Sequence, residues 1–97
     1  MIRVKHEVYD MKEALAFVES NRADIVLVRE KRKIHKILVR IPIVADTLKK
    51  KSPYEPIDLL RGYWVFRYKK GRGKPPVMLV LLEVLGRDNI RYVEEDT

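Results

Sequence analysis

Apolar and polar residues alternate along residues 2–8, and this period of two is typical of a strand with one buried face. The period changes after Asp10, which with Glu13 three positions later has the spacing of a helix-capping pair. Apolar residues then recur at helical spacing over residues 11–21. The sequence therefore predicts a strand followed by an amphipathic helix.

Two segments rich in aliphatic residues, 24–30 and 33–41, flank a basic two-residue link, and we predict a β-hairpin here. From Pro42 the apolar residues return to helical spacing. Three lysines follow where a helix C-terminus favours cations, and Pro53 ends the element. A second helix is therefore expected directly after the hairpin.

The last third of the chain reads mainly as strands. Residues 56–61 are predicted to form a short helical turn, and residues 63–70 form a strand because of their aromatic and β-branched content. Glycine and proline predict a loop over residues 71–76. Residues 77–85 are apolar on both faces, which is typical of a covered central strand, and residues 89–94 form the last strand.

The predicted element order is therefore β-α-β-β-α-β-β-β. This order indicates an α+β protein with an antiparallel or mixed sheet and one or two helices packed on one face. A chain of 97 residues has the length of one domain, so we expect a single compact basic domain over residues 1–97. Its apolar runs are far shorter than the ~20 residues of a membrane span, so no membrane partner is expected.

The composition excludes several classes of chemistry. The chain has no Cys, which removes disulfides, thiolate nucleophiles and sulfur-bound zinc, and which fits a reducing cytoplasmic compartment. Gln is absent while Lys, Arg and Glu are abundant, as in heat-adapted proteins. In composition the chain resembles small basic proteins of thermophilic archaea, some of which sit on ribosomes.

The positive charge is concentrated in the middle of the chain. Residues 1–28 carry a net charge of −1, residues 29–74 carry +11 and residues 75–97 carry −3. The two ends cannot neutralise the middle, so a net positive face must remain somewhere on the folded protein. A polyanion is the partner that such a face favours.

The strand over residues 63–70 is the best candidate for a binding surface. Alternation predicts that Trp64, Phe66 and Tyr68 face the core while Tyr63 and Arg67 face solvent. An exposed ring beside cations can stack a nucleic-acid base while the cations hold its phosphates. The cations of the hairpin, of this strand and of the following loop complete the expected nucleic-acid-binding residues: Arg29, Lys31, Arg32, Lys33, Lys36, Arg40, Tyr63, Arg67, Lys69, Lys70, Arg72 and Lys74.

We therefore predict a small non-enzymatic nucleic-acid-binding protein. RNA, ribosomal or otherwise structured, is favoured over DNA because the expected platform is a strand and no basic recognition helix is apparent. No cofactor and no metal ion are expected. His6 and His35, the two histidines, have apolar neighbours and are interpreted as core residues or as histidines satisfied by local hydrogen bonds.

Two alternatives remain. The chain could be a protein-interaction module or a homodimer that pairs through a strand edge, with the first and last strands as the candidate edges. A small nuclease is less supported. A metal-free ribonuclease would use His35 with nearby Lys and Tyr side chains. A Mg²⁺-dependent nuclease would need carboxylate ligands, but no spacing singles out the candidates Asp46, Glu55, Asp58 and Glu83.

Overall fold

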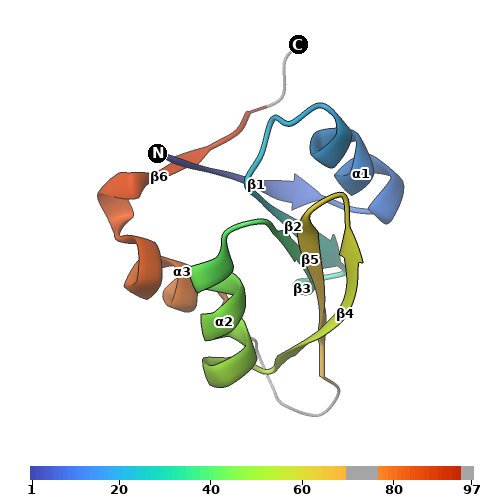
Figure 1. Cartoon of the computed structure of the whole chain (residues 1–97). Coiled ribbons are helices and arrows are strands. Elements are labelled where there is room, and N and C mark those ends of the chain that lie inside the picture. The colour runs from blue at the N-terminus through green and yellow to red at the C-terminus, as the bar shows by residue number, and fades with distance from the viewer. Residues whose placement is uncertain (70–76, 95–97) are drawn as a thin grey trace.

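Six strands form one mixed sheet in the order β4-β5-β3-β2-β1-β6, and helices cover both of its faces (Figure 1). The computed structural model describes residues 1–69 and 77–94 of the chain. The strands are β1 (Ile2–Val8), β2 (Ile25–Glu30), β3 (Lys33–Val39), β4 (Tyr54–Leu60), β5 (Tyr63–Tyr68) and β6 (Ile90–Tyr92). The helices are α1 (Met11–Glu19), α2 (Pro42–Lys51) and α3 (Val77–Leu85), with a 3₁₀ turn η1 (Arg87–Asn89) before β6.

The sheet combines two kinds of strand pairing. β1 lies parallel to both of its neighbours, β2 and β6. The other pairs, β2 with β3, β3 with β5 and β5 with β4, are antiparallel. The fold is thus α+β with a mixed sheet, as predicted.

Each face of the sheet has its own hydrophobic core. On one face α2 and α3 pack against Leu27, Ile37 and Phe66 together with other side chains from β1 to β5. On the opposite face α1 packs against residues that include Leu38 and Val65. The middle strands are therefore buried on both sides, which explains their nearly continuous apolar sequences.

Local sequence signals produce the predicted ends of several elements. The Asp10 carboxylate accepts a hydrogen bond from the Glu13 backbone N–H at 2.7 Å and caps α1, as the spacing predicted. Pro42 occupies the first turn of α2, where its missing N–H costs nothing. The β2–β3 turn closes with Lys31 in the left-handed region at φ 59°.

Residues 77–85 form the helix α3, so the prediction of a strand here is wrong. Val77, Val80 and Leu81 are the buried residues, and their i, i+3, i+4 spacing is that of one helix face. α2 and α3 thus share one face of the sheet, while α1 lies on the other (Figure 1).

Residues 54–60 form the edge strand β4, so the predicted helical turn at 56–61 is also wrong. Pro56 lacks a backbone N–H, and an edge strand tolerates this because one side of its backbone pairs with no neighbour. The β4–β5 register shifts between Pro56 and Asp58, which marks an irregularity at the proline.

The strand edges differ from the expected ones in one respect. β1 lies between β2 and β6, so the first strand is not an edge; β6 is one edge and β4 is the other.

Among the helices in residues 1–69 and 77–94, none has the length and apolar character needed to cross a bilayer.

Candidate nucleic-acid interface

The antiparallel pairing of β3 with β5 brings two distant basic segments together. Lys36 on β3 is the register partner of Arg67 on β5, so the start of β3 lies beside the end of β5. The β2–β3 turn is at this same end of the sheet. We call this region the basic end and define it by seven residues: Arg29, Lys31, Arg32, Lys33, Lys36, Arg67 and Lys69.

Most of the basic end is open to solvent. Five of its seven cations are exposed, whereas Arg29 and Lys36 are half-buried; the exposed ones are Lys31, Arg32, Lys33, Arg67 and Lys69. Arg29 is held in place because its Nε donates to the His6 carbonyl at 3.2 Å. Two carboxylates, Glu30 and Glu55, accompany the seven cations, so a net positive surface remains.

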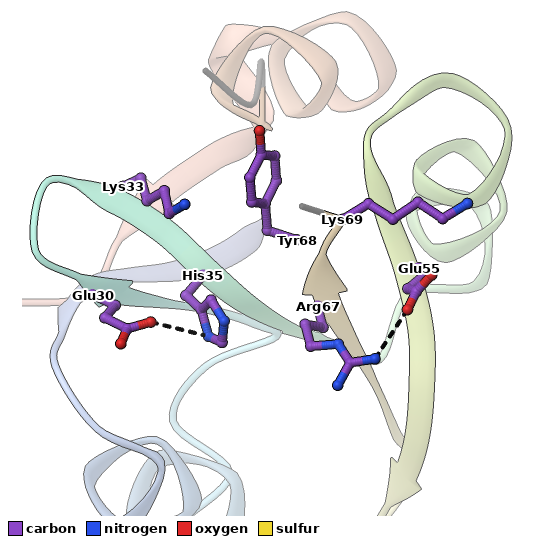
Figure 2. A pocket seen from close by; sticks show the side chains of 7 residues that line it. All are labelled: Glu30, Lys33, His35, Glu55, Arg67, Tyr68 and Lys69. Atoms are coloured by element: carbon purple, nitrogen blue, oxygen red, sulfur yellow. Dashed lines mark hydrogen bonds and ion pairs between the residues drawn. The ribbon is translucent and has the colours of Figure 1, made fainter. Parts of the chain in front are cut away.

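A shallow cavity of about 510 Å³ lies within the basic end (Figure 2). β2, β3, β4 and β5 all contribute to its wall. In Figure 2 the Glu30–His35 pair and the Arg67–Glu55 pair lie on the same side of the strands, whereas Lys33 extends toward the ring of Tyr68. The lining residues are Glu30, Lys33, His35, Glu55, Arg67, Tyr68 and Lys69.

A β-bulge places His35 in this cavity. Val28 pairs with Lys36 and Arg29 pairs with Ile34, which leaves His35 as the extra residue of β3. A bulge re-aims its side chain relative to simple alternation. His35 is thus a half-buried histidine with polar partners and not a core residue, and the sequence carries no turn or glycine signal that would have revealed the bulge.

The surroundings of His35 keep it neutral near pH 7. Burial lowers the pKa of His35 below 6.5, and the nearby Lys36 lowers it further. The Lys36 ammonium lies 3.1 Å from His35 Nδ1, while the Glu30 carboxylate, at 3.6 Å from the same atom, opposes the shift. The imidazole is thus a group that gains charge when an anion arrives or when the pH falls.

Other side chains of the cavity are held by specific contacts. Arg67 donates to Glu55 at 3.1 Å across the β5–β4 pair. The Lys33 ammonium lies 4.6 Å from the centre of the Tyr68 ring, a cation–π contact. These contacts orient two cations toward the cavity and leave both partly exposed to a ligand.

Tyr63 does not belong to the surface, and the expectation of an exposed stacking ring there is wrong. Its side chain is 2 % exposed, and its hydroxyl donates to the Ala23 carbonyl at 2.5 Å. α1 covers this face of the sheet, so alternation along β5 leads into a second core instead of solvent. Trp64, expected in the core, is only half-buried.

Arg40 lies at the opposite end of β3 from the basic end. Its guanidinium pairs with Asp24 at 2.6 Å and lies 5.5 Å from the Tyr63 ring centre. The structure thus gives Arg40 a structural contact and separates it from the seven cations of the basic end. Lys70, Arg72 and Lys74 lie outside the described residues.

The lysines at the end of α2 form a further basic group. α2 ends at Lys51, and β4 begins shortly afterwards at Tyr54, the register partner of Tyr68. This group therefore adjoins the basic end on the α2 side. Two of its members are paired with carboxylates, Lys50 with Asp46 at 3.1 Å and Lys51 with Glu83 at 3.9 Å.

Within the described ranges, no group of three or more His, Asp or Glu side chains is arranged to hold a metal ion.

Compared with known proteins, the chain matches no family model, no curated protein and no solved structure.

Proposed function

We propose that this protein binds nucleic acid through the basic end and that RNA is its preferred ligand. The observation that supports the proposal is the pairing of Lys36 with Arg67, because it gathers cations from two segments about thirty residues apart onto one surface. Phosphates would contact the exposed Lys and Arg side chains. The cavity around His35 would receive one of these phosphates, and the protein would act by binding, without a catalytic step.

The preference for RNA rests on the kind of element that carries the cations. Strands and turns supply the basic end, whereas α1 has a single cation, α3 has none and α2 carries its three lysines only in its last turn. A helix that reads the major groove of DNA needs basic and polar side chains along its length. Single-stranded or looped RNA can instead lie across a strand surface, with its backbone on the cations. A cytoplasmic location is part of the same proposal.

The test compares two triple variants that lose the same charge. One removes three exposed cations of the basic end, Arg32→Gln, Lys33→Gln and Lys69→Gln. Fluorescence anisotropy with a labelled single-stranded RNA is the readout, and DNA of the same sequence is the competitor. We expect at least a tenfold loss of affinity and a decrease of about 2 in the slope of log K against log salt.

The matched control removes three exposed cations elsewhere, Lys12→Gln, Arg61→Gln and Arg87→Gln. It should retain most of the affinity of the wild type. Equal losses in the two triple variants would show that net charge, and not the basic end, drives binding. A DNA competitor as effective as RNA would contradict the preference.

Pairing between copies through a strand edge is the alternative function. β4 exposes Ile57 and Leu59 at its edge, which favours an interaction with another chain. However, Pro56 lacks a donor, and the Leu59 N–H is bonded to the Asp58 carboxylate at 2.7 Å. Light scattering distinguishes the alternatives, because a dimer that does not bind RNA would favour the interaction module.

A further inference from the structure

A second group of cations surrounds a cavity away from the basic end. Three arginines from different parts of the chain line it: Arg3 on β1, Arg22 after α1 and Arg91 on β6. The cavity has a volume of about 560 Å³, and its remaining wall is formed by residues 92–94. β1 and β2 run in parallel, so both strands start at the same end of the sheet. This cavity lies at that end, whereas the basic end lies where β2 ends.

The strand register places two of these arginines side by side. Arg3 and Arg91 are partners in the parallel β1–β6 pair, so their side chains leave the same face of adjacent strands about 4.8 Å apart. Like charges in such positions destabilise a sheet. An anion bound between the two guanidinium groups would remove this repulsion.

Arg3 is held in position before any ligand binds. Its Nε and one terminal nitrogen each lie 3.3 Å from the Asp24 carboxylate, and its other terminal nitrogen donates to the Asn21 carbonyl at 2.8 Å. Asp24 also accepts from the Arg3 backbone N–H at 2.8 Å. The guanidinium therefore loses little conformational entropy when an anion binds.

Arg22 is positioned by packing. Its guanidinium lies 4.4 Å from the centre of the Phe17 ring, and its Nε donates to the Ser20 hydroxyl at 2.9 Å. The ammonium of Lys5 lies 5.3 Å from the centre of the same ring, although Lys5 is only 3 % exposed. A buried cation thus adds to the positive potential behind the cavity.

We propose that the Arg3–Arg22–Arg91 cavity binds a phosphate group. A phosphate presents at least three acceptor oxygens and can engage three guanidinium groups, whereas a carboxylate presents two. Glu94 in the wall weakens the binding of any anion, and Asp24 balances part of the charge of Arg3. The phosphate is a terminal monoester, carried either by a free nucleotide or by the end of an RNA chain, so this site does not depend on the proposed function of the basic end.

The test uses the full chain with ¹⁵N-labelled arginine, observed by NMR at the Nε–H groups. Inorganic phosphate, adenosine 5′-monophosphate and the single-stranded RNA with a 5′-phosphate are titrated separately. We expect saturable shifts of the Arg3 and Arg91 signals with inorganic phosphate. Arg91→Gln should raise its dissociation constant about tenfold, and Glu94→Gln should lower it about threefold.

Arg87→Gln is the matched control, because Arg87 is an exposed arginine that does not line the cavity. The three probes identify the source of the phosphate: tighter binding of the nucleotide indicates a free nucleotide, and tighter binding of the RNA indicates a chain. Absence of saturable shifts with every probe, or equal weakening by Arg87→Gln and Arg91→Gln, would overturn the proposal. Tighter binding of a polyglutamate peptide than of phosphate would also overturn it.

The basic-end triple variant separates this inference from the proposed function. Binding of inorganic phosphate to the arginine cavity should be unchanged in that variant while RNA affinity falls. If wild-type RNA binding holds but phosphate shifts are absent, the cavity proposal fails and the basic end stands. If phosphate shifts are present but the wild type does not bind RNA, the cavity proposal stands and the proposed function fails.

Discussion

Replacing Asp24 by Asn should weaken the fold more than any other single change of a surface charge discussed above. Asp24 precedes β2 and joins the start of β1 to the end of β3. Its carboxylate accepts from Arg40 Nε at 2.8 Å and from an Arg40 terminal nitrogen at 2.6 Å, in addition to its bonds from Arg3. The side chain is 13 % exposed, so solvent screens these bonds only in part.

The magnitude follows from the bonds that are lost. A hydrogen bond to a charged group contributes about 1.5–3 kcal/mol, and such bonds within one network are not additive. Asp24→Asn keeps one acceptor but removes the charge between Arg3 and Arg40, which then repel each other. We expect the free energy of unfolding to fall by about 2–3 kcal/mol and Tm to fall by about 10–20 °C.

The loss should depend on pH with a defined sign. Burial raises the pKa of Asp24, but the hydrogen bonds from Arg3 and Arg40 outweigh it and hold the pKa below 3.8. Because the folded pKa lies below the unfolded one, the stabilisation is complete above about pH 5 and is lost as the pH falls below about 4. Urea unfolding of wild type and Asp24→Asn across this range measures the difference.

The urea slope m should be the same in both proteins, since the surface exposed on unfolding does not change. The difference in unfolding free energy should be constant above pH 5 and should shrink in acid. A difference that persists unchanged to the lowest pH at which the wild type folds would refute the assignment to the Asp24 charge. An equal free energy of unfolding in the two proteins at pH 7 would refute the stabilising role of the whole Asp24 network.

Three further predictions concern other parts of the molecule. Tyr63→Phe should lower the free energy of unfolding, measured in urea, by about 1 kcal/mol because the Ala23 carbonyl loses its donor. An unchanged free energy of unfolding would contradict a stabilising role for this hydrogen bond. RNA affinity measured by anisotropy should rise as the pH falls below about 6.5, because protonated His35 adds a cation, and His35→Gln should abolish this component. Leu81→Ala should lower the free energy of unfolding by about 2–5 kcal/mol because Leu81 is fully buried on the inner face of α3, whereas Leu79→Ala, at 70 % exposure, should lower it by less than about 0.5 kcal/mol. Equal effects of the two substitutions would contradict this orientation of α3.

The start of the chain could be predicted well because its signals are local. The alternation in β1, the Asp10 cap and Pro42 each act within a few residues, and each element begins where its signal indicates. An apolar run is different. Residues 77–85 are apolar on both faces, and periodicity alone does not separate a buried strand from a buried helix.

β4 and Tyr63 were missed for a different reason, which is that tertiary packing decides them. Pro56 is compatible with a helix start or with an edge strand, and only the position of β4 in the sheet chooses the second. Tyr63 is correctly placed on the face opposite Phe66. Whether that face is exposed to solvent depends on α1, which packs there from a distant part of the sequence.

The surface itself could be predicted only as a list of cations. The sequence shows that positive charge is in excess between residues 29 and 74, but not which cations share one side. That depends on the β3–β5 register, which joins Lys36 to Arg67 and excludes Arg40. The bulge at His35 and the Arg3–Arg91 pairing depend on register in the same way.

The salt dependence of RNA affinity tests the central claim most directly. With about five phosphates held by the basic end, log K for a single-stranded RNA should fall linearly with log salt, with a slope near −3.5. A slope of this size, reduced in the basic-end triple variant and retained in its matched control, is the predicted result. Affinity that does not change with salt, or no measurable affinity at low salt, would contradict the account.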